Sequence, residues 1–189
     1  LGKVVLIKSC QQAALWKNAG SILPVSVNIA AAQFTDPGLM GLIEQLLMEC
    51  QLSPDLLELE VTETALIQDP ERTAEILKKF RALGIRIAID DFGTGYSSLS
   101  YLKRFKVDVL KIDMSFVKDM LQDKSDYEIV KTIISLGQSM NIELIAEGIE
   151  TAAHQASLQE LGCLYGQGYY YSKPLPPEQF IQYLQVGKH

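Results

Sequence analysis

PERTAEILKKFRALGIRIAIDD, residues 70–91, decides the fold class, because it predicts a helix and a strand separated by a short turn. Apolar residues recur at helical spacing over Pro70–Leu83, and proline suits the first position of a helix. Gly84 stands where helices commonly end, and Arg86–Ile89 is a short apolar run typical of a buried strand. This succession of helix, glycine and strand indicates an α/β protein.

The same pattern continues along the chain in both directions. The predicted strands are Val25–Ile29, Leu56–Val61, Arg86–Ile89, Val109–Ile112, Glu143–Ala146 and Leu164–Tyr171. The predicted helices are Val4–Lys17, Gly38–Gln51, Pro70–Leu83, Ser125–Met140, Thr151–Leu161 and Pro177–Leu184. Since strands joined through helices usually run parallel, we expect one parallel sheet covered by helices.

Two folds contain such a sheet. An open doubly wound sheet typically carries a G-x-G-x-x-G phosphate loop after its first strand, and no such loop opens a helix in this sequence. Polar side chains instead follow most of the predicted strands, where a TIM (β/α)8 barrel forms its active site. We therefore predict a single domain, residues 1–189, with an incomplete modified TIM barrel: about six strands of the usual eight, the first two missing.

Composition limits the range of functions. The chain has 189 residues, 48% of them hydrophobic, which is enough for one sizeable core. Its 17 basic and 23 acidic residues give a net charge of −6, which argues against DNA binding through the phosphate backbone. No apolar run is long enough for a membrane span. The three cysteines form no paired motif, so we expect a cytoplasmic domain.

Acidic and amide side chains cluster after successive strands. The members of this set are Asn28, Glu60, Asp90, Asp91, Glu147 and Glu150. Carboxylates gathered at one barrel mouth would repel one another without a counter-cation, and oxygen ligands without His or Cys favour Mg²⁺ or Mn²⁺ over zinc. Asp90 is the expected bridge between two ions, an arrangement used to hydrolyse phosphodiesters. His154 and His189 are expected to be exposed and inert.

Asp90 and Asp91 are adjacent, so on a regular strand they would point to opposite faces. Both can approach one site only if the strand turns there, and Phe92–Gly95 supplies a candidate turn. An alternative is that one aspartate caps the following helix.

Lys111 lies between Leu110 and Ile112 in a predicted strand, so its ammonium is expected to project into the polar mouth. A barrel lysine can be a Schiff-base nucleophile, as in aldolases, but this requires a lowered pKa. Neighbouring carboxylates favour the charged form and raise the pKa, so we expect Lys111 to stabilise anionic oxygen or an activated water. A purely structural ion pair is the remaining alternative.

Several motifs together resemble the EAL domain family. They are Ser26-Val27-Asn28, the run from Glu58 to Glu63 (ELEVTE), the run from Asp90 to Leu99 (DDFGTGYSSL), Leu110-Lys111-Ile112-Asp113, the run from Ala146 to Glu150 (AEGIE), and Gly166-Gln167-Gly168. The run from Asp90 to Leu99 is the most specific of these, and the resemblance extends over essentially the whole chain.

The resemblance implies hydrolysis of cyclic di-GMP to linear pGpG in bacterial second-messenger signalling, with two Mg²⁺ or Mn²⁺ ions. It implies these roles: Asn28, Glu60 and Asp90 as metal ligands, Asp91 and Glu147 at the second metal, Lys111 orienting the water, and Glu147 as the general base. Glu63 would brace the loop after Asp91, and Glu150 and Gln167 would complete the site. The dimerisation and regulatory loop would contain Phe92, Gly93, Thr94, Gly95, Tyr96, Ser97 and Ser98, although the apolar segment 96–102 could equally be core.

The sequence departs from the family pattern at its beginning. No Glu-Ala-Leu tripeptide occurs, so we expect an N-terminally truncated domain that lacks one metal ligand and exposes two sheet edges. This leaves two hypotheses: a phosphodiesterase whose intact parent chain is active, while this chain could be inactive without the missing glutamate, or a regulatory module that binds cyclic di-GMP or a protein without catalysis. The expected partners are cyclic di-GMP, a second copy in a homodimer, and sensory or GGDEF domains of a longer parent chain.

Overall fold

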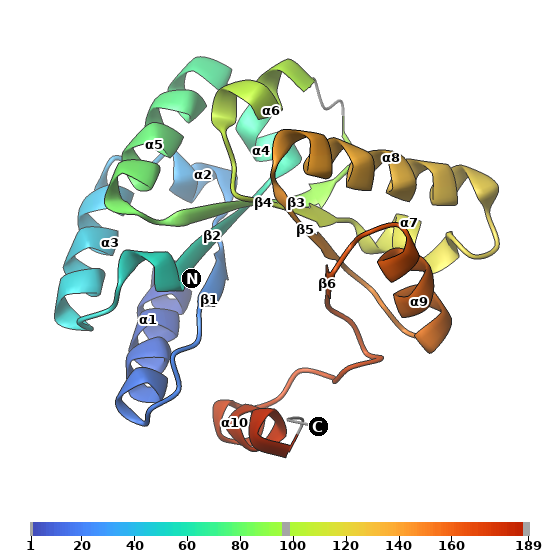
Figure 1. Cartoon of the computed structure of the whole chain (residues 1–189). Helices are drawn as coiled ribbons and strands as arrows, with labels where there is room; N and C mark the ends of the chain where they lie inside the picture. Colours follow the sequence, from blue (N-terminus) through green and yellow to red (C-terminus); the bar gives the residue numbers. More distant parts are fainter. Residues whose placement is uncertain (1, 96–98, 187–189) are drawn as a thin grey trace.

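The structure is a computed structural model, and it describes residues 2–95 and 99–186. Within these residues one parallel sheet contains six strands, each paired with the next along the chain (Figure 1). The strands are β1 Val25–Asn28, β2 Leu57–Thr62, β3 Arg86–Phe92, β4 Val109–Ile112, β5 Glu143–Ala146 and β6 Tyr165–Gly166. The sheet curls into a partial barrel, which confirms the predicted fold class and its incompleteness.

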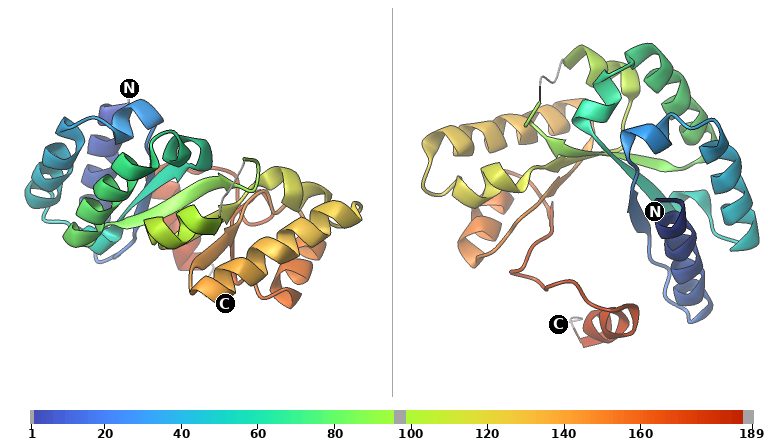
Figure 2. Two further views of the ribbon diagram at one scale, coloured as in Figure 1. Left: turned by 90° about the horizontal axis from the view of Figure 1, so that it is seen from above. Right: turned by 180° about the vertical axis from the view of Figure 1, so that it is seen from behind.

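Helices cover the convex side of the curled sheet (Figures 1 and 2). The helices of the described residues are α1 Gly2–Asn18, α2 Ala31–Phe34, α3 Gly38–Glu49, η1 Pro54–Leu56, α4 Glu63–Ile67, α5 Pro70–Leu83, α6 Leu99–Phe105, α7 Met114–Asp119, α8 Lys124–Met140, α9 Ala152–Glu160 and α10 Pro177–Val186, the last of which does not lie on the convex side. None of the described helices is long and apolar enough to cross a membrane.

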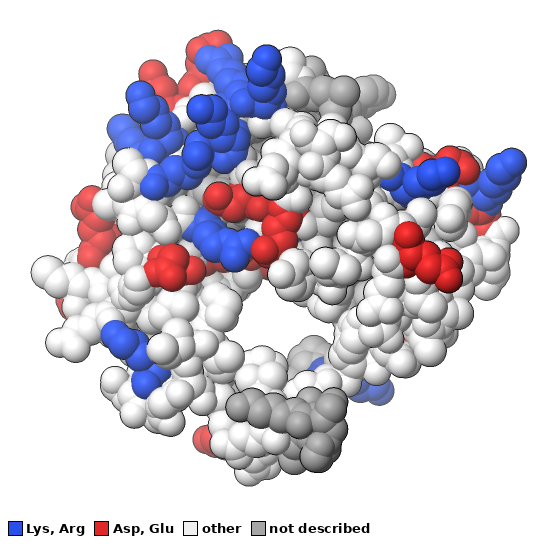
Figure 3. Space-filling model, viewed as in Figure 1, with Lys and Arg blue, Asp and Glu red and all other residues white. Residues whose placement is uncertain are grey.

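Alternation along β2 explains how the sheet separates its core from its polar face. Leu57, Leu59 and Val61 are fully buried and join the hydrophobic core formed with the helices. Glu58 and Glu60 alternate with them and therefore point to the concave side. The hydrophobic core thus lies between sheet and helices, whereas the inside of the curve carries charged groups (Figure 3).

A layer of ion pairs fills the concave side near the amino-terminal ends of the strands. Arg86 joins two carboxylates: its Nε lies 3.3 Å from Glu58 Oε2 and its Nη2 lies 2.9 Å from Glu143 Oε1. Ser26 donates a 2.7 Å hydrogen bond to the other oxygen of Glu58. These contacts connect β1, β2, β3 and β5 across the curve. In β/α barrels the amino-terminal ends of the strands usually contribute to stability, whereas active sites lie at the carboxyl ends.

The sequence predicted α5, β4 and β5 with their observed bounds. The caps agree as well, since Asp69 accepts a hydrogen bond from Arg72 N at the start of α5 and Gly84 ends this helix with φ 88°. Two strand predictions were wrong: β3 continues to Phe92, and β6 covers only Tyr165–Gly166. The short helices α2, α4, α6 and α7 were not predicted, because so few residues carry no recognisable helical period.

The sheet remains open between β1 and β6, and α10 stands apart from the other helices across this opening (Figure 1). The ring of Phe180 in α10 lies 5.6 Å from the ring of Trp16 in α1, measured between centroids. This contact joins the two ends of the described chain, and the centre of the curve is hollow (Figure 3).

Candidate active site

The carboxyl ends of β2, β3, β4 and β5 bring four charged side chains together. The Lys111 ammonium lies 2.9 Å from Glu60 Oε2, 3.0 Å from Asp90 Oδ1 and 2.7 Å from Glu147 Oε1. Lys111 is only 4% exposed and Glu60 only 7%, so this cluster is largely removed from water. One cation on β4 is thus surrounded by three carboxylates from β2, β3 and the end of β5, which leaves the cluster with excess negative charge.

An irregularity in β3 brings Asp91 to the same site as Asp90. The pairing of β3 with β4 shifts between Ile89 and Phe92, and Asp91 has a positive φ of 54°, which is uncommon for a residue other than glycine. The sequence predicts a turn after the two aspartates, at Phe92–Gly95, whereas in the structure the strand bends at Asp91 itself. One carboxylate oxygen from each of Asp90, Asp91 and Glu147 can therefore lie within 4.8 Å of the others.

Burial and like charges shift the pKa values at this site. The pKa of Asp91 is raised by burial and by the nearby Asp90 and Asp113 carboxylates, and Lys111 opposes this shift. Burial likewise raises the pKa of Glu147, although Lys111 lowers it in part. Burial on its own would lower the pKa of Lys111, but its carboxylate partners outweigh burial and raise it. Lys111 is therefore held as an ammonium, and Asp91 and Glu147 bind a proton more readily than exposed carboxylates.

The donor set fits a hard divalent cation. Asp90 Oδ1 is buried, and within the described ranges no group gives it a well-aligned hydrogen bond beyond its ion pair with Lys111. The single Lys111 ammonium is shared among three carboxylates, so the cluster keeps excess negative charge that a further cation would balance. The oxygens of Asp90, Asp91 and Glu147 are the ligand type that Mg²⁺ and Mn²⁺ prefer. Asn28 is paired with Glu60 in the register of β1 and β2, and its role as a metal ligand stays a prediction.

Glu63 holds the loop that follows Asp91. This glutamate begins α4, is 4% exposed, and accepts a 3.1 Å hydrogen bond from Gly93 N through Oε2. A Cβ atom at Gly95 would lie 2.5 Å from Glu63 Oε1, so a larger residue here would require the Glu63 carboxylate or the loop to move. Glu63 thus contacts the loop as the sequence analysis expected. Of the predicted dimerisation loop, Tyr96, Ser97 and Ser98 lie outside the described residues, and its role in dimerisation stays a prediction.

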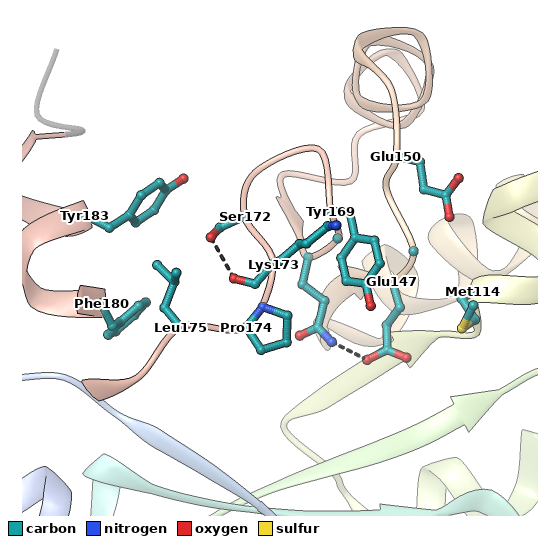
Figure 4. Close-up of a pocket in the computed structure, with 13 residues that line it drawn as sticks. Met114, Glu147, Glu150, Tyr169, Ser172, Lys173, Pro174, Leu175, Phe180 and Tyr183 are labelled. Carbon is teal, nitrogen blue, oxygen red and sulfur yellow. Dashed lines mark hydrogen bonds between the residues drawn. The ribbon is translucent and has the colours of Figure 1, made fainter. Parts of the chain in front are cut away.

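Gln167 and Glu150 lie beside Glu147. Gln167 Nε2 donates a 2.9 Å hydrogen bond to Glu147 Oε1, the same oxygen that contacts Lys111. Among the described side chains none donates to Glu147 Oε2, so this oxygen can accept a proton. Glu150 is exposed and lines the neighbouring pocket with Glu147 (Figure 4).

The pocket beside Glu147 has a volume of about 500 Å³. Figure 4 shows Met114, Glu147 and Glu150 at one end, and Leu175, Phe180 and Tyr183 at the other. The remaining wall comes from the segment after β6: Gln167, Gly168, Tyr169, Ser172, Lys173 and Pro174, with Gly148 completing the lining. A carboxylate site thus opens directly into a space with flat aromatic walls.

Sequence reasoning missed part of this site. Asp113 was named only as part of the Leu110–Asp113 motif and was given no role, but it caps α7 by accepting from Ser115 N and also raises the pKa of Asp91. Its place directly after β4 was the available signal. The aromatic wall was missed because Leu164–Tyr171 was predicted as a strand. His154 was expected to be exposed, but it is 7% exposed and buried beneath the Glu150 turn. His189 lies outside the described residues.

The fold and the site define a class of protein, a partial parallel β/α barrel with a carboxylate cluster that could hold a metal ion at the carboxyl ends of its strands. The EAL domain model matches residues 1–174, so the chain belongs to the EAL domain family. The chain is 44% identical over 184 residues to the signaling protein YkoW of Bacillus subtilis, and 41% identical over 182 residues to the bifunctional diguanylate cyclase/cyclic di-GMP phosphodiesterase MucR of Pseudomonas aeruginosa. These matches cover 97% and 96% of the chain but 23% and 27% of the relatives, so the chain spans about a quarter of their length.

Solved structures agree with this assignment. The structure described as the PaMucR phosphodiesterase in complex with c-di-GMP gives a TM-score of 0.92 at 42% identity, over 95% of this chain and 73% of that chain. A manganese and cyclic di-GMP complex of BlrP1 from Klebsiella pneumoniae gives 0.83 at 30% identity, over 92% of this chain and 44% of that chain.

Proposed function

We propose that this chain is a catalytic domain that hydrolyses cyclic di-GMP to linear pGpG with Mg²⁺ or Mn²⁺. The observation that carries the proposal is the convergence of Asp90, Asp91 and Glu147, whose carboxylate oxygens can lie within 4.8 Å of one another. The relatives named as acting on or binding cyclic di-GMP support the choice of substrate.

The metal ligands would be Asp90, Asp91, Glu147, Glu60 and Asn28. Divalent cations held by these oxygens would lower the pKa of a bound water and neutralise charge on the phosphate. The relative whose complex contains manganese supports this part of the proposal.

Glu147 is the proposed general base. Its pKa is raised by burial, toward the working pH that suits a base, and its Oε1 is fixed by Lys111 and Gln167. Hydrolysis needs the attacking water to lose one proton as its oxygen forms a bond to phosphorus. The P–O3′ bond then breaks, and the 3′ oxygen takes up a proton from solvent or from the site. Glu147 Oε2 would receive the proton of the water.

Lys111 would stabilise negative charge at the phosphate and keep Glu60, Asp90 and Glu147 together. Its raised pKa keeps the side chain protonated, and a protonated amine cannot attack a carbonyl. This argues against the aldolase-like alternative.

The pocket beside Glu147 would hold one guanine of the substrate. Tyr169, Phe180 and Tyr183 offer flat apolar surfaces for a base, and Lys173 lies with its Nζ 5.8 Å from the centre of the Tyr169 ring. Aromatic side chains commonly bind nucleobases by stacking.

The test is conversion of cyclic di-GMP to pGpG by the chain, followed by chromatographic separation of the cyclic and linear forms. We expect turnover with Mn²⁺, none with EDTA, and a loss of about 100-fold or more for Glu147→Gln. Glu160→Gln, an exposed change at the end of α9, is the matched control. Binding of cyclic di-GMP without turnover would favour the regulatory module instead.

A further inference from the structure

His154 is a buried imidazole that the proposed chemistry does not use. It is the third residue of α9, after the N-cap Thr151, and only 7% of its surface is exposed. Burial of a histidine without partners would be costly, so its hydrogen bonds identify what it does.

Two hydrogen bonds join His154 to the turn before α9. Its backbone N–H donates to Thr151 Oγ1 at 3.2 Å, which caps the helix. Its side chain accepts from the backbone N–H of Glu150 through Nδ1 at 3.4 Å. This reciprocal arrangement resembles a capping box, in which the third helical residue reaches back to the amide before the helix. In this contact Nδ1 of His154 is the acceptor and the Glu150 amide is the donor.

The amide held by His154 belongs to the turn that carries Glu147. Three further backbone bonds fix this turn from the other side: Gln167 N to Ala146 O at 2.8 Å, Ile149 N to Gln167 O at 3.1 Å, and Tyr170 N to Ile149 O at 2.9 Å. They attach the turn to the segment after β6.

Gly148 in the middle of the turn has a positive φ of 72°. A Cβ atom at this glycine would lie 2.7 Å from Met114 Cβ, so the turn packs closely against α7. His154 supplies the contact with α9, and the turn is thereby held from three directions.

We propose that His154 is a positioning residue: its Nδ1 fixes the Glu147–Glu150 turn, so that Glu147 is aligned in the site and Glu150 in the pocket. The inference rests on the proposed function for its catalytic consequence, but the contact itself can be measured independently. Displacing a general base by even a fraction of an ångström lowers turnover more than substrate binding, so the expected effect is on kcat.

Three variants separate positioning from packing. His154→Leu keeps a similar volume but removes the acceptor. His154→Asn places an amide oxygen where Nδ1 lies and should restore the bond. Gln159→Leu, an exposed polar-to-apolar change on the same helix, is the matched control.

The first readout is hydrogen exchange of the Glu150 amide measured by NMR, which needs no catalysis. We expect about tenfold or faster exchange in His154→Leu, and exchange near that of the parent chain in His154→Asn and Gln159→Leu. The second readout is turnover of cyclic di-GMP with Mn²⁺. We expect kcat to fall about tenfold in His154→Leu with little change in KM, and to recover to within about threefold in His154→Asn.

Unchanged exchange and unchanged kcat in His154→Leu would overturn the proposal. So would a folded His154→Asn protein that is impaired as much as His154→Leu, and this result is decisive even if the leucine variant does not fold. If the unsubstituted chain shows no turnover, the proposed function alone is refuted. The exchange of the Glu150 amide would still report whether His154 fixes the turn.

Discussion

Replacing Lys111 with Met should destabilise the metal-free protein strongly, and a divalent cation should reduce this loss. The ammonium makes contacts of 2.7 to 3.0 Å with Glu60, Asp90 and Glu147 and is 4% exposed. Removing one partner from a buried ion pair costs about 3–5 kcal/mol, because the remaining charges stay buried without compensation. The loss of folding free energy should approach the upper end of this range, because three carboxylates lose the one cation that contacts all of them among the described residues.

The assay is urea unfolding at pH 8, in EDTA and in millimolar Mn²⁺. At this pH the stabilisation by Lys111 is fully present: its folded pKa is raised, so the contribution is complete below the unfolded pKa of about 10.4 and is lost at higher pH. In EDTA we expect the free energy of unfolding to fall by about 3–5 kcal/mol. In Mn²⁺ the difference in free energy of unfolding between Lys111→Met and the unsubstituted chain should shrink by about 1–3 kcal/mol. The cation replaces the missing positive charge and binds only the folded chain.

Lys103→Met is the control, because this α6 lysine is exposed and its loss should change stability by no more than about 0.5 kcal/mol. The reasoning would be refuted by a Lys111→Met protein as stable as Lys103→Met in EDTA. It would also be refuted if Mn²⁺ stabilised the parent and Lys111→Met chains equally.

Three further predictions concern other parts of the molecule. Gly95→Ala should lower turnover about tenfold or more with little effect on urea unfolding, because the new Cβ would lie 2.5 Å from Glu63 Oε1 and displace the loop after Asp91. Arg86→Met should lower the free energy of unfolding by about 2–4 kcal/mol in urea, because Glu58 would stay buried without its cation; an unchanged midpoint would contradict this. Cys10 should make the protein less stable as the pH rises from 7 to 10, since burial raises its folded pKa from 9.0 to about 11 and the unfolded thiol ionises first. The expected loss is about 1.4 kcal/mol, and Cys10→Ala should remove that part of the pH dependence in urea titrations at the two pH values.

The sequence predicted most of the fold because its signals are local. The helix over Pro70–Leu83 has a proline at its start, a glycine at its end and a clear apolar period, and the structure reproduces these bounds. The strands Val109–Ile112 and Glu143–Ala146 are apolar runs bounded by polar residues. The parallel direction of the strands could be predicted because a helix lies between most successive strands.

The site was harder to predict where tertiary contacts decide the geometry. The convergence of Asp90 with Asp91 depends on a positive φ at Asp91, and the local sequence did not show that the strand bends there. The short β6 ends where backbone bonds to the turn at Ile149 replace sheet pairing, although the run of tyrosines favours a strand. His154 was misjudged because its burial depends on the segment that precedes its own helix.

The most direct test of the central claim is calorimetric titration of the chain with Mn²⁺. Our account predicts binding to the parent chain and to Asp119→Asn, an exposed control at the end of α7, but binding at least about tenfold weaker for Asp90→Asn. Equal affinity of Asp90→Asn and the parent chain would contradict a metal site built on the carboxyl ends of β3 and β5.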